Sequence, residues 1–311
     1  MLRIKQSNPM HSVQDLGRYG FASQGVAKAG PMDSVAACWA NACLGNACLG
    51  NAVTLPLLEI GGGGFVAEFT KDVNFALTGA WGEMTLDGKP LPGPGAYPVS
   101  AGSVLRLGRF SSGMFSYVAV QGGFVIQPVL ASVSTCQRDS LGGLDGQGES
   151  LSIDDALPYQ ASEHRPLNLI PRRYLDSYHQ PLVCDVILRE TDQFASDATE
   201  VFLNQGYKVT REQSRMGYRL EGDLSIVAER PRYSVPIPLG GIQVPPSGQP
   251  IVLMRDHQSL GGYPMLGTLT RKSLGQLAQR RDDQMVSFRA VSRDIAVQEF
   301  LQCRQFFGDF R

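Results

Sequence analysis

The densest group of polar residues able to do chemistry lies between residues 241 and 264. A short apolar run separates Gln243 from Asp256 and Gln258, and a Gly-Gly-Tyr-Pro segment containing Tyr263 follows. A buried strand that ends in a carboxylate and an amide can direct both into a pocket, and glycine lets a ligand approach the backbone closely. We therefore predict catalytic roles for Asp256 and Gln258 and substrate binding by Gln243 and Tyr263. The alternative is a β-hairpin in which Asp256 and Gln258 only bond the backbone of the turn.

Two further polar loops contain arginines that could bind an anion. Arg215 and Arg219 are four residues apart with an aromatic residue between them, which suits carboxylate recognition, although surface ion pairing would give the same pattern. Arg18 and Asp33 lie in two glycine-containing loops near the start of an expected helix, where backbone N–H groups could also hold an anion. Alternatively, Asp33 only caps the helix and Arg18 pairs with a carboxylate. We predict that Arg18, Asp33 and Arg215 bind substrate.

A small ligand with both a carboxylate and an amide would need both kinds of residue in one place. The planar guanidinium group of arginine suits the carboxylate, whereas Gln258 and Asp256 can hydrogen-bond the amide. We therefore expect Arg18 and Arg215 to converge on one pocket with Asp256, Gln258 and Tyr263, although they are far apart in the sequence.

An evenly spaced cysteine series first suggests a metal site. Cys38, Cys43 and Cys48 are each five residues apart, and thiolates bind zinc and iron–sulfur clusters well. The series follows, however, from the sequence Asn-Ala-Cys-Leu-Gly, which occurs twice in succession over residues 41–50, and no fourth ligand is nearby. We predict no metal site.

Composition and motifs also exclude several partners. The 28 basic and 29 acidic residues nearly balance, so nucleic acid is not an expected partner. The four glycines at 61–64 lack the lysine of a phosphate-binding loop and predict a turn between strands. No Met-Lys-Met segment of the kind that carries biotin is present, so no cofactor is bound by a recognisable motif. The N-terminus has no signal-peptide pattern and no apolar stretch is long enough to span a membrane, so we expect a cytoplasmic chain.

Short β-branched and alternating runs predict a mainly β protein with a few helices. A two-residue turn at Asp87-Gly88 predicts a hairpin. One helix is expected over residues 34–44, with Asp33 as N-cap, and another from Ser292 to about Phe307. We expect the second helix to pack its apolar stripe on a sheet. The predicted strands cover residues 2–6, 65–69, 73–77, 83–86, 104–107, 115–120, 182–188, 251–254 and 285–291.

Several segments, taken in order, resemble one known family. They are Gln14-Asp15-x-Gly17-Arg18-x-Gly20, Gly30-x-Met32-Asp33, Leu58-Glu59-Ile60, Tyr117-x-Ala119-Val120-x-Gly122-Gly123, Arg215-Met216-Gly217-Tyr218-Arg219-Leu220 and the run from Gln243 to Pro264. Together they are similar to the allophanate hydrolase subunit 2 family, also called the biotin-dependent carboxyltransferase or KipA-like family. The resemblance extends from about residue 1 to about residue 290.

The resemblance implies two cyclophilin-like β-barrel units, which we place at residues 1–165 and 166–311. It also implies the role of the C subunit of a 5-oxoprolinase, which opens 5-oxoproline to glutamate using ATP together with an A-like partner and a B-like, or KipI-like, partner. ATP would then be used by the complex, through one of these partners, and the substrate would be a small amide or lactam. Two other roles in the family are the carboxyltransferase of a urea carboxylase and a KipA-like antagonist of a histidine-kinase inhibitor. A shared fold cannot by itself choose among them.

Three segments depart from the family pattern. Val133 stands where an arginine is common, Val235 replaces a polar residue, and Ser259-Leu260 replaces a Thr-Thr pair. The first change removes a cation that could contact substrate or a partner. These departures affect the expected substrate but not the expected fold.

Overall fold

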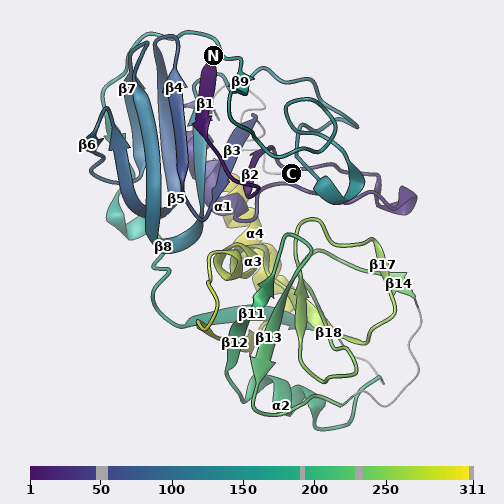
Figure 1. The fold of residues 1–311 in the computed structure, drawn as a ribbon. Coiled ribbons are helices and arrows are strands. Elements are labelled where there is room, and N and C mark those ends of the chain that lie inside the picture. Colours follow the sequence, from purple (N-terminus) through teal and green to yellow (C-terminus); the bar gives the residue numbers. More distant parts are fainter. Residues whose placement is uncertain (47–54, 190–192, 228–233, 308–311) are drawn as a thin grey trace. The chain divides into compact units, whose positions relative to one another are not determined.

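The computed structural model describes residues 1–46, 55–189, 193–227 and 234–307, and within them the chain is mostly β (Figure 1). It forms two compact units, which we call the N-terminal and C-terminal units. The N-terminal unit contains Met1–Tyr19, Ala29–His179 and Cys303–Arg311, and the C-terminal unit contains Gly20–Lys28 and Gln180–Gln302. The sequence suggested one boundary near residue 165. In the structure the chain passes from one unit to the other between His179 and Gln180. Two short segments are exceptions: Gly20–Lys28 belongs to the C-terminal unit and Cys303–Arg311 to the N-terminal unit.

The N-terminal unit is built on a ten-stranded sheet whose main path runs β10-β7-β5-β8-β4-β1-β9. Neighbouring strands pair in antiparallel fashion, and β2, β3 and β6 attach beside this path. Large apolar side chains such as Phe65, Phe69 and Phe75 are fully buried in its core. The strands are β1 Leu2–Gln6, β2 His11–Gln14, β3 Leu57–Gly61, β4 Phe65–Phe69, β5 Val73–Leu86, β6 Lys89–Pro90, β7 Gly95–Val99, β8 Val104–Val120, β9 Ala156–Leu157 and β10 Asn168–Leu169.

Two of these strands are much longer than the sequence predicted. The runs at 73–77 and 83–86 merge into β5, and those at 104–107 and 115–120 merge into β8. The register between β5 and β8 shifts near Gly79 and Gly82, so bulges bend the pair without ending it. Gly79 has φ of +82°, and a Cβ there would lie 2.4 Å from the carbonyl oxygen of Phe115. Only glycine fits where the two strands approach this closely. The glycines therefore break the alternating sequence pattern, while the strand itself continues through them.

Local signals in the first third of the chain are confirmed. Helix α1 spans Ser34–Cys43, and the Asp33 side chain accepts hydrogen bonds from the N–H groups of Val35 and Ala36, both at 3.1 Å. The hairpin at Asp87-Gly88 joins β5 to β6, with φ positive at both turn residues. The glycines at 62–64 form the turn between β3 and β4. Most of the repeated Asn-Ala-Cys-Leu-Gly copy, including Cys48, lies outside the described residues.

The C-terminal unit is a closed barrel with strand order β11-β18-β15-β16-β13-β12-β19. Parallel pairing of β11 with β19 completes the closure. Tyr207 and Phe202 are fully buried and pack against Phe288 in its interior. The strands are β11 Leu182–Leu188, β12 Tyr207–Gln213, β13 Gly217–Gly222, β15 Gly241–Gln243, β16 Ile251–Leu253, β18 Met265–Leu269 and β19 Met285–Ala290, with a separate ribbon of β14 Val235–Pro236 and β17 Leu260–Gly261.

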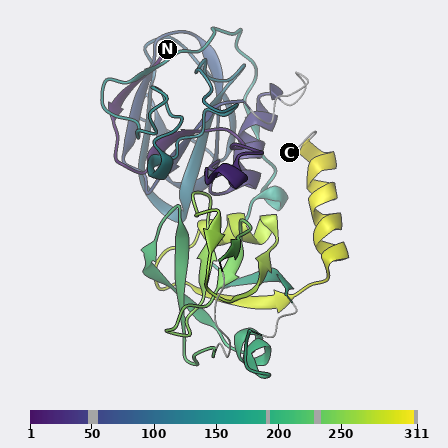
Figure 2. The same ribbon diagram turned by 90° about the vertical axis from the view of Figure 1, so that its right-hand side faces the viewer.

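Three α-helices follow barrel strands: α2 Ala198–Leu203, α3 Arg271–Ala278 and α4 Arg293–Phe307. Figure 2 shows α4 as one uninterrupted helix, as predicted. The expected packing of α4 on a sheet is wrong, because its described side-chain contacts come from other helices. Arg271 of α3 lies over the ring of Phe300, and Phe307 packs edge-on against Trp39 of α1. Across the described residues, no helix has both the length and the apolar character needed to cross a membrane.

Candidate functional site

A pocket of about 390 Å³ opens in the C-terminal unit and contains three of the predicted site residues. Gln243, Gln258 and Tyr263 all line it, although the first is twenty residues from the last in sequence. Gln243 is buried, whereas Tyr263 is 42% exposed, so the pocket has a buried amide at its base and a phenol nearer solvent. The remaining lining residues come mainly from β13, β16 and the loop before β13: Glu212, Ser214, Met216, Gly217, Arg219, Ile251, Leu253 and His257.

Close packing at Gly261 holds the Gln243 side chain in place. Gln243 ends β15, where it pairs with Ile251 on one side and Met265 on the other. A Cβ on Gly261 would lie 2.8 Å from Nε2 of Gln243 and 2.4 Å from Cδ1 of Ile237. The missing side chain at Gly261 therefore makes room for the ends of Ile237 and Gln243, and the predicted approach of a ligand to this glycine stays a prediction.

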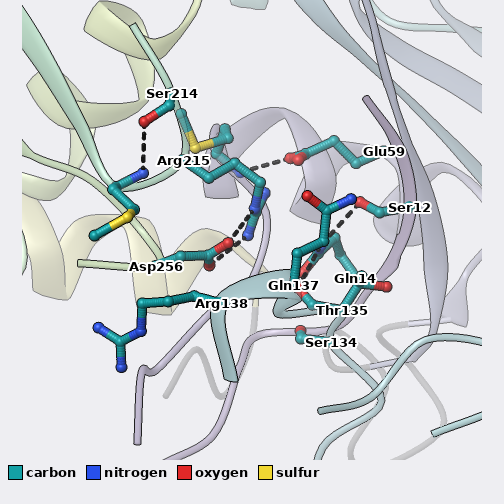
Figure 3. A network of polar contacts seen from close by, with 12 residues as sticks. Ser12, Gln14, Glu59, Ser134, Thr135, Gln137, Arg138, Ser214, Arg215 and Asp256 are labelled. Carbon is teal, nitrogen blue, oxygen red and sulfur yellow. Dashed lines mark hydrogen bonds and ion pairs between the residues drawn. The ribbon is translucent and has the colours of Figure 1, made fainter. Parts of the chain in front are cut away.

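Asp256 and Arg215 form an ion pair with each other (Figure 3). Nε of Arg215 donates to Oδ2 of Asp256 at 2.7 Å, and Nη2 donates to Oδ1 at 3.0 Å. The Asp256 side chain is only 6% exposed and that of Arg215 is 23% exposed. Such a two-point pair fixes both groups in orientation. Neither residue is among the described residues that line the pocket.

The backbone ties the same two loops together. The N–H of Asp256 donates to the carbonyl oxygen of Arg215 at 2.7 Å, and the N–H of Met254 donates to that of Met216 at 3.0 Å. The ion pair and these bonds hold the segment from Met254 to Gln258 against the start of β13. The positions of Gln258 and His257 in the pocket therefore depend on Asp256 and Arg215.

Sequence reasoning missed His257 as a pocket residue. Its Nδ1 lies 2.7 Å from the carbonyl oxygen of Gln258, and because a carbonyl can only accept, this contact requires a proton on Nδ1. The only available signal was its place between Asp256 and Gln258. Arg219 and Glu212 also line the pocket and pair with each other at 2.7 Å.

Arg18 and Asp33 belong to the N-terminal unit, so their convergence with Asp256 stays a prediction. Both are 3% exposed. Nε of Arg18 donates to the carbonyl oxygen of Val129 at 3.2 Å, and Nη2 to that of Ser132 at 3.4 Å. Asp33 caps α1, as described above. The Asp33 contacts match the alternative in which it caps the helix. These two contacts of Arg18 are to backbone carbonyl oxygens and not to the carboxylate that its alternative named.

Asp15 explains the unusual segment around Val133. Its carboxylate accepts hydrogen bonds from Ser132 Oγ at 2.5 Å, Ser134 Oγ at 2.7 Å, Val133 N–H at 2.9 Å and Gly17 N–H at 2.9 Å. The Val133 side chain is 4% exposed and belongs to the hydrophobic core of the unit. The departure from arginine at this position thus places an apolar side chain in an apolar environment.

A second buried network surrounds Glu59, which is 1% exposed. Its Oε2 accepts from the N–H of Met32 at 2.6 Å and from the hydroxyl of Tyr117 at 2.9 Å, and that hydroxyl also accepts from the N–H of Asp33 at 2.7 Å. Burial, followed by the nearby charges of Glu59 and Asp33, raises the pKa of Tyr117 well above its ordinary value. Tyr117 therefore stays protonated and orders the loop before α1.

The pocket offers several hydrogen-bonding groups. Two amides, an imidazole and a phenol can both donate to and accept from a small polar ligand. Among the residues that the structure describes, no three His, Cys, Asp or Glu side chains form a group able to hold a metal ion. This chemistry suits recognition of an amide or lactam.

Comparison with known proteins agrees with the fold and the motifs. Residues 24–290 match the family described as the carboxyltransferase domain, subdomain A and B. The chain belongs to this family.

Two relatives within the carboxyltransferase family match nearly the whole chain. The C subunit of 5-oxoprolinase from Haemophilus influenzae is 37% identical over 297 residues, covering 94% of this chain and 92% of the relative. The protein of the same name in Escherichia coli K12 is 34% identical over 317 residues, covering 98% and 94%. The crystal structure of the K. lactis urea amidolyase shares the fold, with a TM-score of 0.88 at 24% identity over all of this chain and 20% of that one.

Proposed function

We propose that the chain is the C subunit of a 5-oxoprolinase, acting with A-like and B-like partners to open 5-oxoproline to glutamate using ATP. One observation carries this proposal: two relatives with that name match this chain over more than nine-tenths of both lengths at 34–37% identity. The match therefore extends over nearly the whole of this chain and of each relative.

The pocket in the C-terminal unit is the proposed substrate site. In 5-oxoproline a carboxylate and a lactam share one small ring, so their partners need to lie close together. Gln243 and Gln258 can hydrogen-bond the lactam, and Arg219 at the same pocket provides a cation for the carboxylate. Hydrolysis breaks the ring C–N bond and adds water across it, and bonds to the carbonyl oxygen stabilise the charge that develops there.

Asp256 takes part in this proposal as a positioning residue. Its carboxylate is engaged by Arg215, so it acts on the substrate through the loop that carries His257 and Gln258. Gln258 is the candidate for direct contact with the reacting amide.

Reconstitution tests the proposed function. The full chain is combined with its A-like and B-like partners, and glutamate formation from 5-oxoproline is measured with and without ATP. We expect formation to require both ATP and this chain. Undiminished glutamate formation when the chain is left out would contradict the proposal.

Matched glutamine variants test the site. Gln258→Leu and Gln243→Leu should each lower kcat/KM by about tenfold or more, because a hydrogen bond to a reacting group is worth about 1.4 kcal/mol or more. Gln298→Leu, on the exposed part of α4, is the control and should leave kcat/KM unchanged. Equal activity of all three variants would remove the pocket from the mechanism while leaving the proposed role of the chain in the complex intact.

Carboxyl transfer to a urea-like amide is the second candidate, because a urea amidolyase contains the same fold. It would require carboxybiotin supplied by another chain. A urea-dependent consumption of carboxybiotin by the purified chain, with no glutamate formed in the reconstitution, would favour it.

A further inference from the structure

A second pocket lies in the N-terminal unit and has no role in the proposed reaction. It has a volume of about 520 Å³, within the range typical of small-molecule sites. Its walls come from α1, β5, β8 and the segments at residues 92–94 and 169–178. Both tryptophans of the chain, Trp39 and Trp81, line it.

Four aromatic rings line this pocket. Tyr174 and Tyr178 join the two tryptophans, and the rings of Trp39 and Tyr174 lie 5.5 Å apart at 42°. Such rings favour offset or edge contacts with another flat ring. Tyr174 is 43% exposed, which leaves its ring accessible at the mouth.

Packing of the C-terminal helix accounts for only part of these rings. Phe306 and Phe307 contact Trp39 at centroid distances of 5.1 and 5.2 Å, and Phe306 also lies 5.9 Å from the ring of Tyr174. Neither phenylalanine lines the pocket, and its volume remains with both contacts formed. The space is therefore bounded by Trp81 and Tyr178 as well as by Trp39.

Two exposed charged residues complete the lining. Arg172 lies in the short helical turn Arg172–Tyr174, and Asp176 follows it in the same segment. Arg173, the next residue, stacks its guanidinium 4.9 Å from the centre of the Tyr174 ring. Arginine suits a phosphate, and a carboxylate accepts hydrogen bonds from sugar hydroxyls.

We propose that this pocket binds a nucleotide. A base would stack on the aromatic rings, a ribose hydroxyl would donate to Asp176, and a phosphate would pair with Arg172. The proposal goes beyond the function of the C-terminal pocket and does not depend on it. It rests on the combination of flat rings, a carboxylate and a guanidinium group around one hollow of sufficient size.

Tryptophan fluorescence of the purified full chain provides a direct test, since both tryptophans line the pocket. AMP should change the emission saturably. Adenosine, which lacks the phosphate, should bind about tenfold more weakly, and ribose 5-phosphate, which lacks the base, should cause no saturable change. Calorimetry with AMP gives an affinity that does not depend on the fluorophores.

Matched variants separate the two parts of the site. Arg172→Gln should weaken AMP binding about tenfold but leave adenosine within about twofold, because only the phosphate contact is lost. Tyr174→Leu should weaken both ligands, because stacking is lost. Arg106→Gln and Tyr19→Leu, exposed residues of the same unit outside the pocket, should bind AMP as the unaltered chain does.

Two results would overturn the proposal. One is no saturable response to AMP, ADP or ATP up to about 10 mM, since weaker binding than that is not specific recognition. The other is AMP binding that Arg172→Gln and Tyr174→Leu leave equal to that of the control variants.

Discussion

The two units use similar polar motifs in different ways. In the N-terminal unit Asp15 and Asp33 accept hydrogen bonds from nearby backbone and hydroxyl groups, and Arg18 donates to backbone carbonyls. In the C-terminal unit Gln258 and Tyr263 line a pocket, and the ion pair of Asp256 holds the loop that carries Gln258. Both units place Asp and Arg residues in loops that also contain glycine. The difference lies in whether the local backbone uses up the hydrogen-bonding capacity of the side chain.

The largest expected effect tests the structural role of the N-terminal motif. Asp15→Ala removes the acceptor of four hydrogen bonds and should lower the free energy of unfolding by about 4 kcal/mol, since each buried donor left without an acceptor costs about 1–3 kcal/mol. Chemical denaturation measures it. Asp145→Ala, at an exposed turn where the carboxylate accepts from the N–H of Gln147, should cost under about 1 kcal/mol. Equal losses in both variants would show that the contacts of Asp15 do not stabilise the unit.

Breaking the ion pair between Arg215 and Asp256 should lower the free energy of unfolding less than the Asp15 substitution does. Arg215→Met leaves the Asp256 carboxylate buried without its cation and should cost about 3 kcal/mol in stability, together with most of the activity of the reconstituted complex. The matched control is Arg211→Met, whose partner Asp282 is exposed, and it should cost under about 1 kcal/mol. Adding Asp256→Leu to Arg215→Met should recover part of the stability but not the activity. Recovery of both would mean that the pair has no positioning role.

Acid should destabilise the N-terminal unit because of His11. The N–H of Asn8 donates to Nδ1 at 3.1 Å, so Nε2 carries the proton that faces the carbonyl oxygen of Gly63. Burial lowers the pKa of His11 from 6.5 to about 4. As the pH falls, His11 therefore takes up a proton in the unfolded chain before it does so in the folded chain. The free energy of unfolding should fall by about 2 kcal/mol as the pH drops from 6.5 to 4.

Denaturation at several pH values measures this loss in variants of two histidines. His11→Gln should flatten the dependence between pH 6.5 and 4, whereas His164→Gln, at an exposed position, should keep it. An unchanged slope in His11→Gln would assign the acid sensitivity to other groups.

The smallest expected effect on stability comes from Gly261→Ala, which tests whether the geometry of the pocket matters for activity independently of folding. Gly261→Ala brings a Cβ against the mobile ends of Ile237 and Gln243, and should cost about 1 kcal/mol because both side chains can shift. Activity should fall more than stability, because the Gln243 amide is displaced. Gly93→Ala, where a Cβ meets nothing within 4 Å, is the control for adding a methyl group. A loss of activity no larger than in Gly93→Ala would indicate that the position of Gln243 does not matter.

Sequence reasoning worked best where a single turn of chain contains the whole signal. Asp33 caps α1, Asp87-Gly88 turns a hairpin, and α4 covers the residues that the pattern indicated. It underestimated the lengths of β5 and β8. A glycine at a bulge and a glycine at the end of a strand give the same sequence pattern, and only pairing with the neighbouring strand distinguishes them. It was wrong about the packing of α4, since amphipathic spacing does not say whether a sheet or a helix covers the apolar face.

The sequence by itself determined the mainly β composition, the family and the segment that contains the pocket in the C-terminal unit. Family membership rests on short motifs kept in order, and those can be read without coordinates. Only the tertiary structure decided which polar residues face open space. Arg215 and Asp256 are 41 residues apart and each has several possible partners, so their pairing depends on barrel closure. The aromatic pocket in the N-terminal unit likewise depends on long-range packing, because its rings come from segments more than a hundred residues apart.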